Sequence, residues 1–468
     1  MIPHVPEGGL SCNSTVSGQA GWEGPPVAVL WDQSLVWGII CLDTLQRMGI
    51  PVHLLNGEDI AGGVLKRYRI LLVPGGWASH KMRALGEAGK SQVRHFIETG
   101  GSYIGFCGGA GLALSSPPAL ELVPLERMSL AERLPNASGR VTIRGISGHP
   151  AWKDLPEELP VSIWWPSQFS WQPLPRSLCL ASYTAARNDF WVADLPLADL
   201  QDRTIPWQEW EGIYGINLNP RRLIGQPAIM EMRLGKGRLI LSYPHLETPG
   251  DELGNRLFLN ILGYLNHEAS LHPSRVSGDE SGAPPVSRFA VAPRQASFQH
   301  FARIQKTVDD LILFGERHLL WKWRHPWLLH WRRGIRGMEY GTLAVAIRSI
   351  VQVAAMGDAP SLCTDTADPW LESAKRLEED VQVFCHLARH LLLEEKLATQ
   401  SGNLSKLGKV NETVDALRER LFGSKMNHGG LCRQLFDEMD GLLLHLLRQS
   451  LTCREASGST PSCQEWRP

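Results

Sequence analysis

One cysteine lies in a stretch that suits a nucleophile. Cys107 stands within Gly105-Phe106-Cys107-Gly108-Gly109-Ala110-Gly111, where a predicted strand meets a predicted helix. A sharp strand-to-helix turn strains the backbone of its central residue, so the neighbouring residues must be small. Unpaired N–H groups at the start of a helix favour a thiolate over a thiol. We therefore predict a nucleophile elbow with Cys107 as nucleophile, the alternative being a buried, inert cysteine after a core strand.

A base and its orienting carboxylate follow a later strand. Tyr243-Pro244-His245-Leu246-Glu247 comes directly after the predicted strand that ends at Ser242. In an extended segment, residues two apart point to the same side, so His245 and Glu247 can face one pocket. A thiol nucleophile needs a base, and the base needs a group that orients it. The sequence predicts a catalytic triad of Cys107, His245 and Glu247, although a surface loop pair is the default for an isolated His-x-Glu.

Backbone N–H groups complete the predicted site. The N–H of Gly108 follows the nucleophile, and Pro74-Gly75-Gly76 ends a strand that we expect to be a neighbour. We predict an oxyanion hole from the N–H groups of Gly76 and Gly108. Other residues at the same sheet edge are candidates for lining the pocket, namely Asp32, Gly75, Trp77 and Ser79. For Asp32 a plain N-cap of the following helix is equally good, and for Trp77 and Ser79 loop packing is an equal alternative.

The elements that must hold these residues alternate between strand and helix. Short apolar runs at 27–31, 52–55, 70–73 and 102–106 read as buried parallel strands, with helical spacing between them. Residues 228–232 and 238–242 flank Gly235-Lys236-Gly237 and predict a hairpin. We expect an α/β fold with a mostly parallel sheet and helices on both faces.

The second half of the chain reads as helical. We predict a disordered tail at 1–24, an α/β domain at 25–266, a linker at 267–294, an α-helical bundle domain at 295–452 and a polar tail at 453–468. The segment 321–333 interleaves Trp with Arg and Lys, which suits a membrane surface or a nucleic-acid strand. We favour an amphipathic helix with its Trp side chains packed inward, docked on the first domain. Trp164, Trp165 and Gln168 are interpreted mainly as core or rim residues.

Composition narrows the range of functions. The chain has 47 Lys plus Arg against 48 Asp plus Glu, so its charge gives no reason to expect a nucleic-acid partner. Nine scattered cysteines form no disulfide framework, and no secretory signal or membrane-spanning run is visible. We therefore expect a cytoplasmic protein. His386 and His390 lie four apart beside Cys385, but a zinc site needs more ligands, so we predict no metal.

The quoted motifs resemble a known superfamily. The stretch from Leu71 to Leu114 resembles a class I glutamine amidotransferase domain. The resemblance lies in its Pro-Gly-Gly turn, its Gly-Phe-Cys-Gly-Gly and the later His-x-Glu. The version it resembles most is the N-terminal domain of biotin–protein ligases, also found as a free-standing bacterial module. The resemblance covers residues 25–266 and implies a flavodoxin-like three-layer αβα sandwich with Cys107 as nucleophile. Gly108-Gly109-Ala110-Gly111 departs from the Leu-Gly-His/Gln pattern of glutaminases, and no Gly-Arg-Gly-Arg loop of a biotin ligase occurs.

Two functions remain open at this point. The first is hydrolysis or acyl transfer on the carbon–nitrogen bond of a small-molecule amide or acyl substrate, through a thioester and without any cofactor; glutamine is one candidate. The second is a catalytically inactive binding or regulatory module of the same fold. In that case the helical domain would bind a protein partner or mediate self-association.

Overall fold

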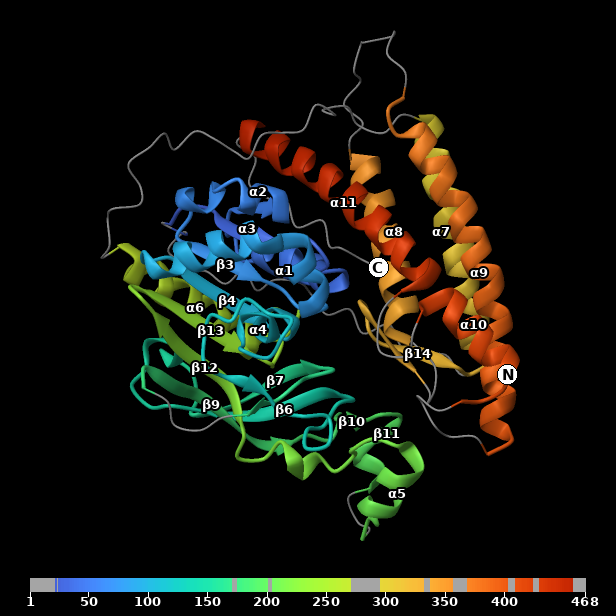
Figure 1. The fold of residues 1–468 in the computed structure, drawn as a ribbon, viewed down its shortest axis with the longest axis horizontal. Coiled ribbons are helices and arrows are strands. Elements are labelled where there is room, and N and C mark those ends of the chain that lie inside the picture. The colour runs from blue at the N-terminus through green and yellow to red at the C-terminus, as the bar shows by residue number, and fades with distance from the viewer. Residues whose placement is uncertain are drawn as a thin grey trace, which may run out of the picture.

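The structure, a computed structural model, shows an α/β part and a helical part packed side by side (Figure 1). It describes residues 22, 24–170, 175–200, 204–270, 295–331, 337–356, 368–402, 409–423 and 429–457. Most of the predicted tails and of the linker lies outside these residues. Helix α6 runs to Ser270 and helix α11 runs to Ser457, a few residues beyond the predicted domain limits.

A parallel sheet forms the centre of the α/β part. Its strands lie in the order β2-β1-β3-β4-β13, which is the strand order of flavodoxin-like folds. The strands are β1 (Val27–Leu30), β2 (Val52–Leu55), β3 (Ile70–Val73), β4 (Ser102–Phe106) and β13 (Gly237–Ser242). Nearly every residue in them is buried because helices cover both faces of the sheet.

Two apolar layers enclose this sheet. On one face, alternate strand residues such as Val29 and Ile104 pack with helices α1 (Val36–Arg47) and α6 (Glu252–Ser270). On the other face, residues such as Leu71 pack with helices α3 (Ala78–Glu98) and α4 (Gly108–Ala113). The short helix α2 (Gly57–Ala61) packs against α3. The predicted three-layer fold is thereby confirmed.

An antiparallel extension continues the sheet beyond β13. It begins with β12 (Pro227–Leu234), which pairs with β13 around the predicted glycine turn. The further strands are β9 (Ser177–Ala186), β6 (Ala137–Gly145), β7 (Glu158–Trp164), β10 (Trp191–Val192) and β11 (Leu195–Pro196). Strands β5 (Glu126–Arg127) and β8 (Phe169–Ser170) form a separate pair, and helix α5 (Trp207–Tyr214) follows β11.

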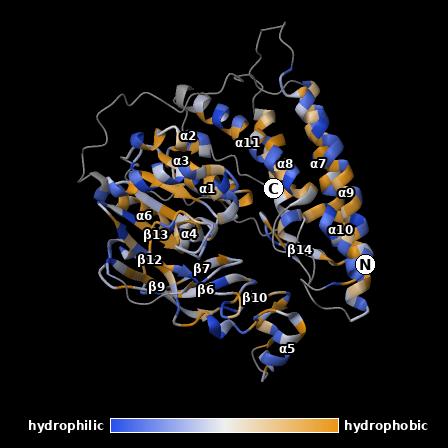
Figure 2. Ribbon diagram, viewed as in Figure 1, coloured by the Kyte–Doolittle hydropathy of each residue, from blue (hydrophilic) through white to orange (hydrophobic). Residues whose placement is uncertain are grey.

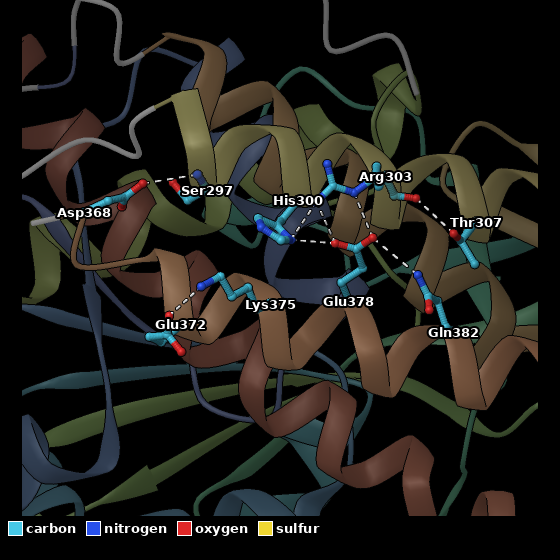
Figure 3. Close-up of polar contacts among 9 residues, drawn as sticks. All are labelled: Ser297, His300, Arg303, Thr307, Asp368, Glu372, Lys375, Glu378 and Gln382. Carbon is cyan, nitrogen blue, oxygen red and sulfur yellow. Dashed lines mark hydrogen bonds and ion pairs between the residues drawn. The ribbon is translucent and has the colours of Figure 1, made fainter.

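The helical part follows, and its apolar core is continuous with that of the α1–α6 layer. Its helices are α7 (Gln295–Arg317), α8 (Gly337–Met356), α9 (Leu371–Gln400), α10 (Glu412–Phe422) and α11 (Gly430–Ser457). Figure 2 shows hydrophilic and hydrophobic residues sharing these helices, as expected where one side of each helix packs inward. Figure 3 shows polar contacts that join α7 to α9: His300 Nδ1 and Arg303 Nε lie 2.5 Å and 2.8 Å from the Glu378 carboxylate. No helix in the described ranges is long and apolar enough to cross a membrane.

The tryptophan-rich segment is not the helix that we predicted. Trp321–His325 and Leu328–Trp331 form an antiparallel hairpin, β14–β15. Pro326 stands inside the segment, where a helix interior would lose a hydrogen bond and meet a steric clash, and it falls at the turn instead. The predicted docking on the first domain is present, because Arg324 Nη1 donates to Ser138 Oγ at 2.8 Å.

Gly315 allows this hairpin to pack against α7. A Cβ at Gly315 would lie 2.1 Å from the Trp321 indole ring, whose Nε1 donates to the Ile312 carbonyl at 3.0 Å. We expect Gly315→Ala to lower the free energy of unfolding by about 1–3 kcal/mol through overpacking. Urea denaturation would measure this loss of stability. Gly441→Ala on α11 is the control, since its Cβ meets nothing within 4 Å; equal stability of the two variants would contradict this packing.

Candidate active site

Cys107 occupies a strained turn between β4 and α4. Its backbone angles are φ 47° and ψ −103°, in a region that L-residues rarely adopt. Its N–H donates to the Ser242 carbonyl at 2.8 Å, and its carbonyl accepts from Gly111 N at 2.9 Å. Strain of this kind is characteristic of sites where the surrounding structure fixes one side chain for function. The cysteine itself is partly exposed.

The glycines around Cys107 are required by close backbone packing. A Cβ at Gly108 would lie 1.8 Å from the Gly76 carbonyl oxygen, and one at Gly109 would lie 1.9 Å from the Val73 oxygen. A Cβ at Gly105 would lie 2.6 Å from the backbone of Gly109. The elbow therefore lies directly against the β3–α3 loop. The two glycines predicted for the oxyanion hole, Gly76 and Gly108, are brought together.

His245 and Glu247 are joined by a hydrogen bond. His245 Nδ1 lies 2.7 Å from Glu247 Oε1, and both side chains are fully buried. The chain reaches this geometry through a turn in which Thr248 N donates to the His245 carbonyl at 3.1 Å. The predicted pairing thus forms, although the segment is not extended. Trp37 stacks on the imidazole with ring centroids 4.3 Å apart.

The imidazole of His245 interacts with both Glu247 and the Cys107 side chain. Burial by itself would lower the pKa of His245, but the Glu247 charge and a hydrogen-bonding interaction with the Cys107 side chain raise that pKa to about 10. His245 is therefore positively charged at neutral pH. Glu247 occupies Nδ1, and the buried Nε2 has no hydrogen-bond partner among the described residues, so Nε2 is the ring nitrogen that is free to meet the sulfur or a substrate.

The predicted pocket-lining residues have different surroundings. Gly75 lies beneath the imidazole, since a Cβ there would be 3.1 Å from His245 Cε1. Trp77 and Ser79 are partly buried at the start of α3. Asp32 Oδ2 accepts from Gly57 N at 2.6 Å, and burial raises the pKa of its carboxyl. Asp32 does not cap α1, whose N-cap is Leu35 without a side-chain hydrogen bond; it binds the first residue of α2 instead.

One of the three residues interpreted as core or rim, Trp165, approaches the sulfur. The Trp165 carbonyl lies 3.8 Å from Cys107 Sγ, and Trp165 has a φ of 49°. Gln168 is fully buried, accepts from Leu134 N at 2.7 Å and donates to the Arg222 carbonyl at 2.9 Å. Trp164 is buried and donates to Thr248 Oγ1 at 3.1 Å. Gln168 and Trp164 are thus part of the packed structure, as interpreted, while Trp165 forms a wall of the site.

A charge cluster at the edge of β1 is marked by no motif in the sequence. Lys81 on α3 is fully buried, and its Nζ donates to Ser34 Oγ at 2.5 Å and to the Asp32 carbonyl at 3.1 Å. Burial lowers the pKa of Lys81 to about 7. Asp440 of α11 accepts from Gln33 N at 3.0 Å, and burial raises the pKa of its carboxyl to about 7. The helical part therefore reaches the sheet edge that carries the site.

The two α9 histidines that the sequence places four apart, His386 and His390, have ordinary surroundings. His390 Nε2 lies 3.8 Å from Glu394 Oε1, one turn along the same helix, and His386 is exposed. In the part of the chain that the structure describes, no group of three or more His, Cys, Asp or Glu side chains could hold a metal ion.

Comparison with known proteins gives one family match. Residues 65–116, which contain the Pro-Gly-Gly loop and the elbow, match the family model of the N-terminal domain of biotin–protein ligase. No curated protein matches the chain.

Several solved structures match part of the chain at low overall similarity. A putative GMP synthase subunit from Thermoplasma acidophilum is 12% identical, with a TM-score of 0.36, over 54% of this chain and 100% of that one. A glutamine amidotransferase from Thermotoga maritima is 12% identical, with a TM-score of 0.29, over 54% of this chain and 87% of that one. A putative ThuA-like protein from Bacteroides uniformis is also 12% identical, with a TM-score of 0.35, over 53% of this chain and 94% of that one.

Proposed function

We propose that this chain carries a cysteine-dependent site of the glutamine amidotransferase type, which breaks a carbon–nitrogen bond through a thioester. The observation that supports it most is the fully buried His245, fixed by Glu247 on one nitrogen and interacting with Cys107 through its side chain. This is the arrangement of a nucleophile, a base and an orienting carboxylate. The family match around the elbow points the same way.

In the proposed reaction the Cys107 sulfur attacks the carbonyl carbon of an amide. A sulfur–carbon bond forms, and the carbonyl oxygen becomes an oxyanion that accepts from the N–H groups of Gly108 and Gly76. The carbon–nitrogen bond then breaks while the His245 imidazolium gives its proton to the departing nitrogen. Water or an acceptor amine attacks the resulting thioester, His245 takes up the proton of the attacking group, and the sulfur is released.

The charge on His245 fits this order of events. An imidazolium beside the sulfur stabilises a thiolate, as in other cysteine enzymes. Glu247 keeps the ring in one orientation and balances its charge, so that the proton sits on Nε2 where the leaving nitrogen would need it. Glutamine is one candidate substrate.

Thiol reactivity tests the proposal directly. We expect iodoacetamide at pH 6.5 to label Cys107 at least 10-fold faster than the partly buried Cys179, as followed by mass spectrometry of the labelled peptides. His245→Ala should slow the labelling of Cys107 about 10-fold or more, because the neighbouring charge is lost. His267→Ala, an exposed histidine on α6, is the matched control and should change nothing.

Equal labelling of Cys107 and Cys179 would contradict the catalytic site. It would favour the other function left open by the sequence, a binding module with an inherited elbow.

A further inference from the structure

A guanidinium lies beside the loop that covers Cys107. Arg133 Nη1 donates to the hydroxyl of Ser167. Ser167 is two residues beyond Trp165, whose carbonyl is 3.8 Å from Cys107 Sγ. Consistent with this closeness, the charges of Arg133 and the Cys107 sulfur interact electrostatically. The positive group of Arg133 is therefore held on the wall of the site.

A second arginine belongs to the same wall. Arg127 on β5 pairs with Phe169 on β8, and the Phe169 ring packs on Tyr243 with centroids 4.3 Å apart. Tyr243 precedes His245 by two residues. Arg127 also interacts electrostatically with both Tyr243 and Arg133. Two arginines thus converge on one side of the cysteine–histidine pair.

Among the described residues, no carboxylate pairs with the positive charges on this wall. Within the ranges that the structure describes, neither Arg127 nor Arg133 forms an ion pair with a carboxylate, and the buried Arg133 Nε has no hydrogen-bond partner there. Burial and the charge of Arg127 lower the pKa of Arg133, which reflects the cost of this arrangement. Buried polar groups and charges normally have partners, so an exception calls for a ligand of opposite charge.

We propose that Arg127 and Arg133 form an anion-binding subsite beside Cys107, so that the substrate carries a carboxylate or a phosphate group near the carbonyl that the sulfur attacks. Guanidinium groups bind both of these anions through paired N–H donors. The role in catalysis rests on the proposed function, whereas binding of the anion does not.

Two alkylating reagents of nearly equal size test the subsite. Iodoacetate carries a carboxylate and iodoacetamide does not. We expect the ratio of their rate constants, iodoacetate over iodoacetamide, to be at least 10-fold higher at Cys107 than at Cys179. Arg133→Gln should bring the two ratios within about 2-fold of each other, and Arg133→Lys should give an intermediate value. Arg221→Gln, an exposed arginine, is the control and should keep the wild-type ratio. A ratio at Cys107 equal to that at Cys179 in the wild-type chain would overturn the subsite.

A binding measurement separates the two proposals and the two kinds of anion. The Cys107→Ala chain is titrated with glutarate and, separately, with inorganic phosphate in a calorimeter. Binding of glutarate alone assigns a carboxylate, and binding of phosphate alone assigns a phosphate group. In either case the affinity should fall at least 10-fold in Cys107→Ala/Arg133→Gln. Equal binding by both variants, or none by either, overturns the subsite. A Cys107 that reacts with neither reagent, in a chain that still binds the anion through Arg133, overturns the proposed function alone.

Discussion

Gly108→Ala is expected to remove the selective labelling of Cys107, slowing its reaction with iodoacetamide at least 10-fold. A Cβ at this position would lie 1.8 Å from the Gly76 oxygen and 2.7 Å from its carbonyl carbon. Both atoms are backbone and cannot rotate away, so the elbow and the β3–α3 loop must separate. That movement changes the position of the sulfur and of both proposed oxyanion donors. The free energy of unfolding should fall by about 1–3 kcal/mol, measured by urea denaturation.

Gly111→Ala in the same helix provides the matched control. Its Cβ would meet only the Ala78 Cβ, at 3.9 Å, which is an ordinary contact. Alanine is favoured over glycine within helices, so the variant should be as stable as the wild type or more so. It should also keep the wild-type labelling rate. If Gly108→Ala behaved like Gly111→Ala, the packing between Gly108 and Gly76 would not shape the site.

Local sequence patterns were enough to predict the parts of the site that belong to sharp turns. The small residues around Cys107 are needed because backbone atoms approach closely there, and such a need is visible in sequence. The buried strands β1 and β3 were equally visible as apolar runs. The pairing of His245 with Glu247 was predicted for a partly wrong reason, since it forms across a turn rather than along an extended strand.

Contacts between distant segments were not predictable in this way. Lys81 reads as an ordinary residue of an amphipathic helix, and nothing nearby in sequence shows that Asp440 comes to lie beside it. Arg127 and Arg133 belong to no motif, because their partners Phe169 and Ser167 come from another loop. The spacing of residues in the segment 321–331 is compatible with a helix. The segment forms a hairpin instead, because Pro326 favours a turn and the strands pack on the first domain.

Lys81→Met is expected to change how stability depends on pH. Burial lowers the pKa of Lys81 from its ordinary value of 10.5 to about 7. Between these values the unfolded chain holds a proton on Lys81 that the folded chain has released. The free energy of unfolding of the wild type therefore rises with pH in this window, relative to Lys81→Met, by up to about 1.4 kcal/mol per pH unit.

Urea denaturation at pH 6, 7, 8 and 9 measures this effect. The stability difference between the wild type and Lys81→Met should stay nearly constant below pH 7 and then grow, by about 3 kcal/mol at pH 9. Lys66→Met, an exposed lysine of the same domain, should give a flat difference. A flat difference for Lys81→Met as well would mean that water reaches its ammonium group.

Asp440→Asn should give a slope of the opposite sign in a lower window. Burial raises the pKa of Asp440 from 3.8 to about 7, so here the folded chain holds the proton that the unfolded chain has lost. The wild type should therefore lose stability relative to Asp440→Asn as the pH rises from about 4 to 7. Asp440 is partly buried where α11 lies on the edge of β1, and the Trp31 indole donates to the Asp440 carbonyl at 3.1 Å. The pH dependence of the stability difference between the wild type and Asp440→Asn therefore reports the position of α11. If the difference did not change with pH, α11 would not lie against the site in solution.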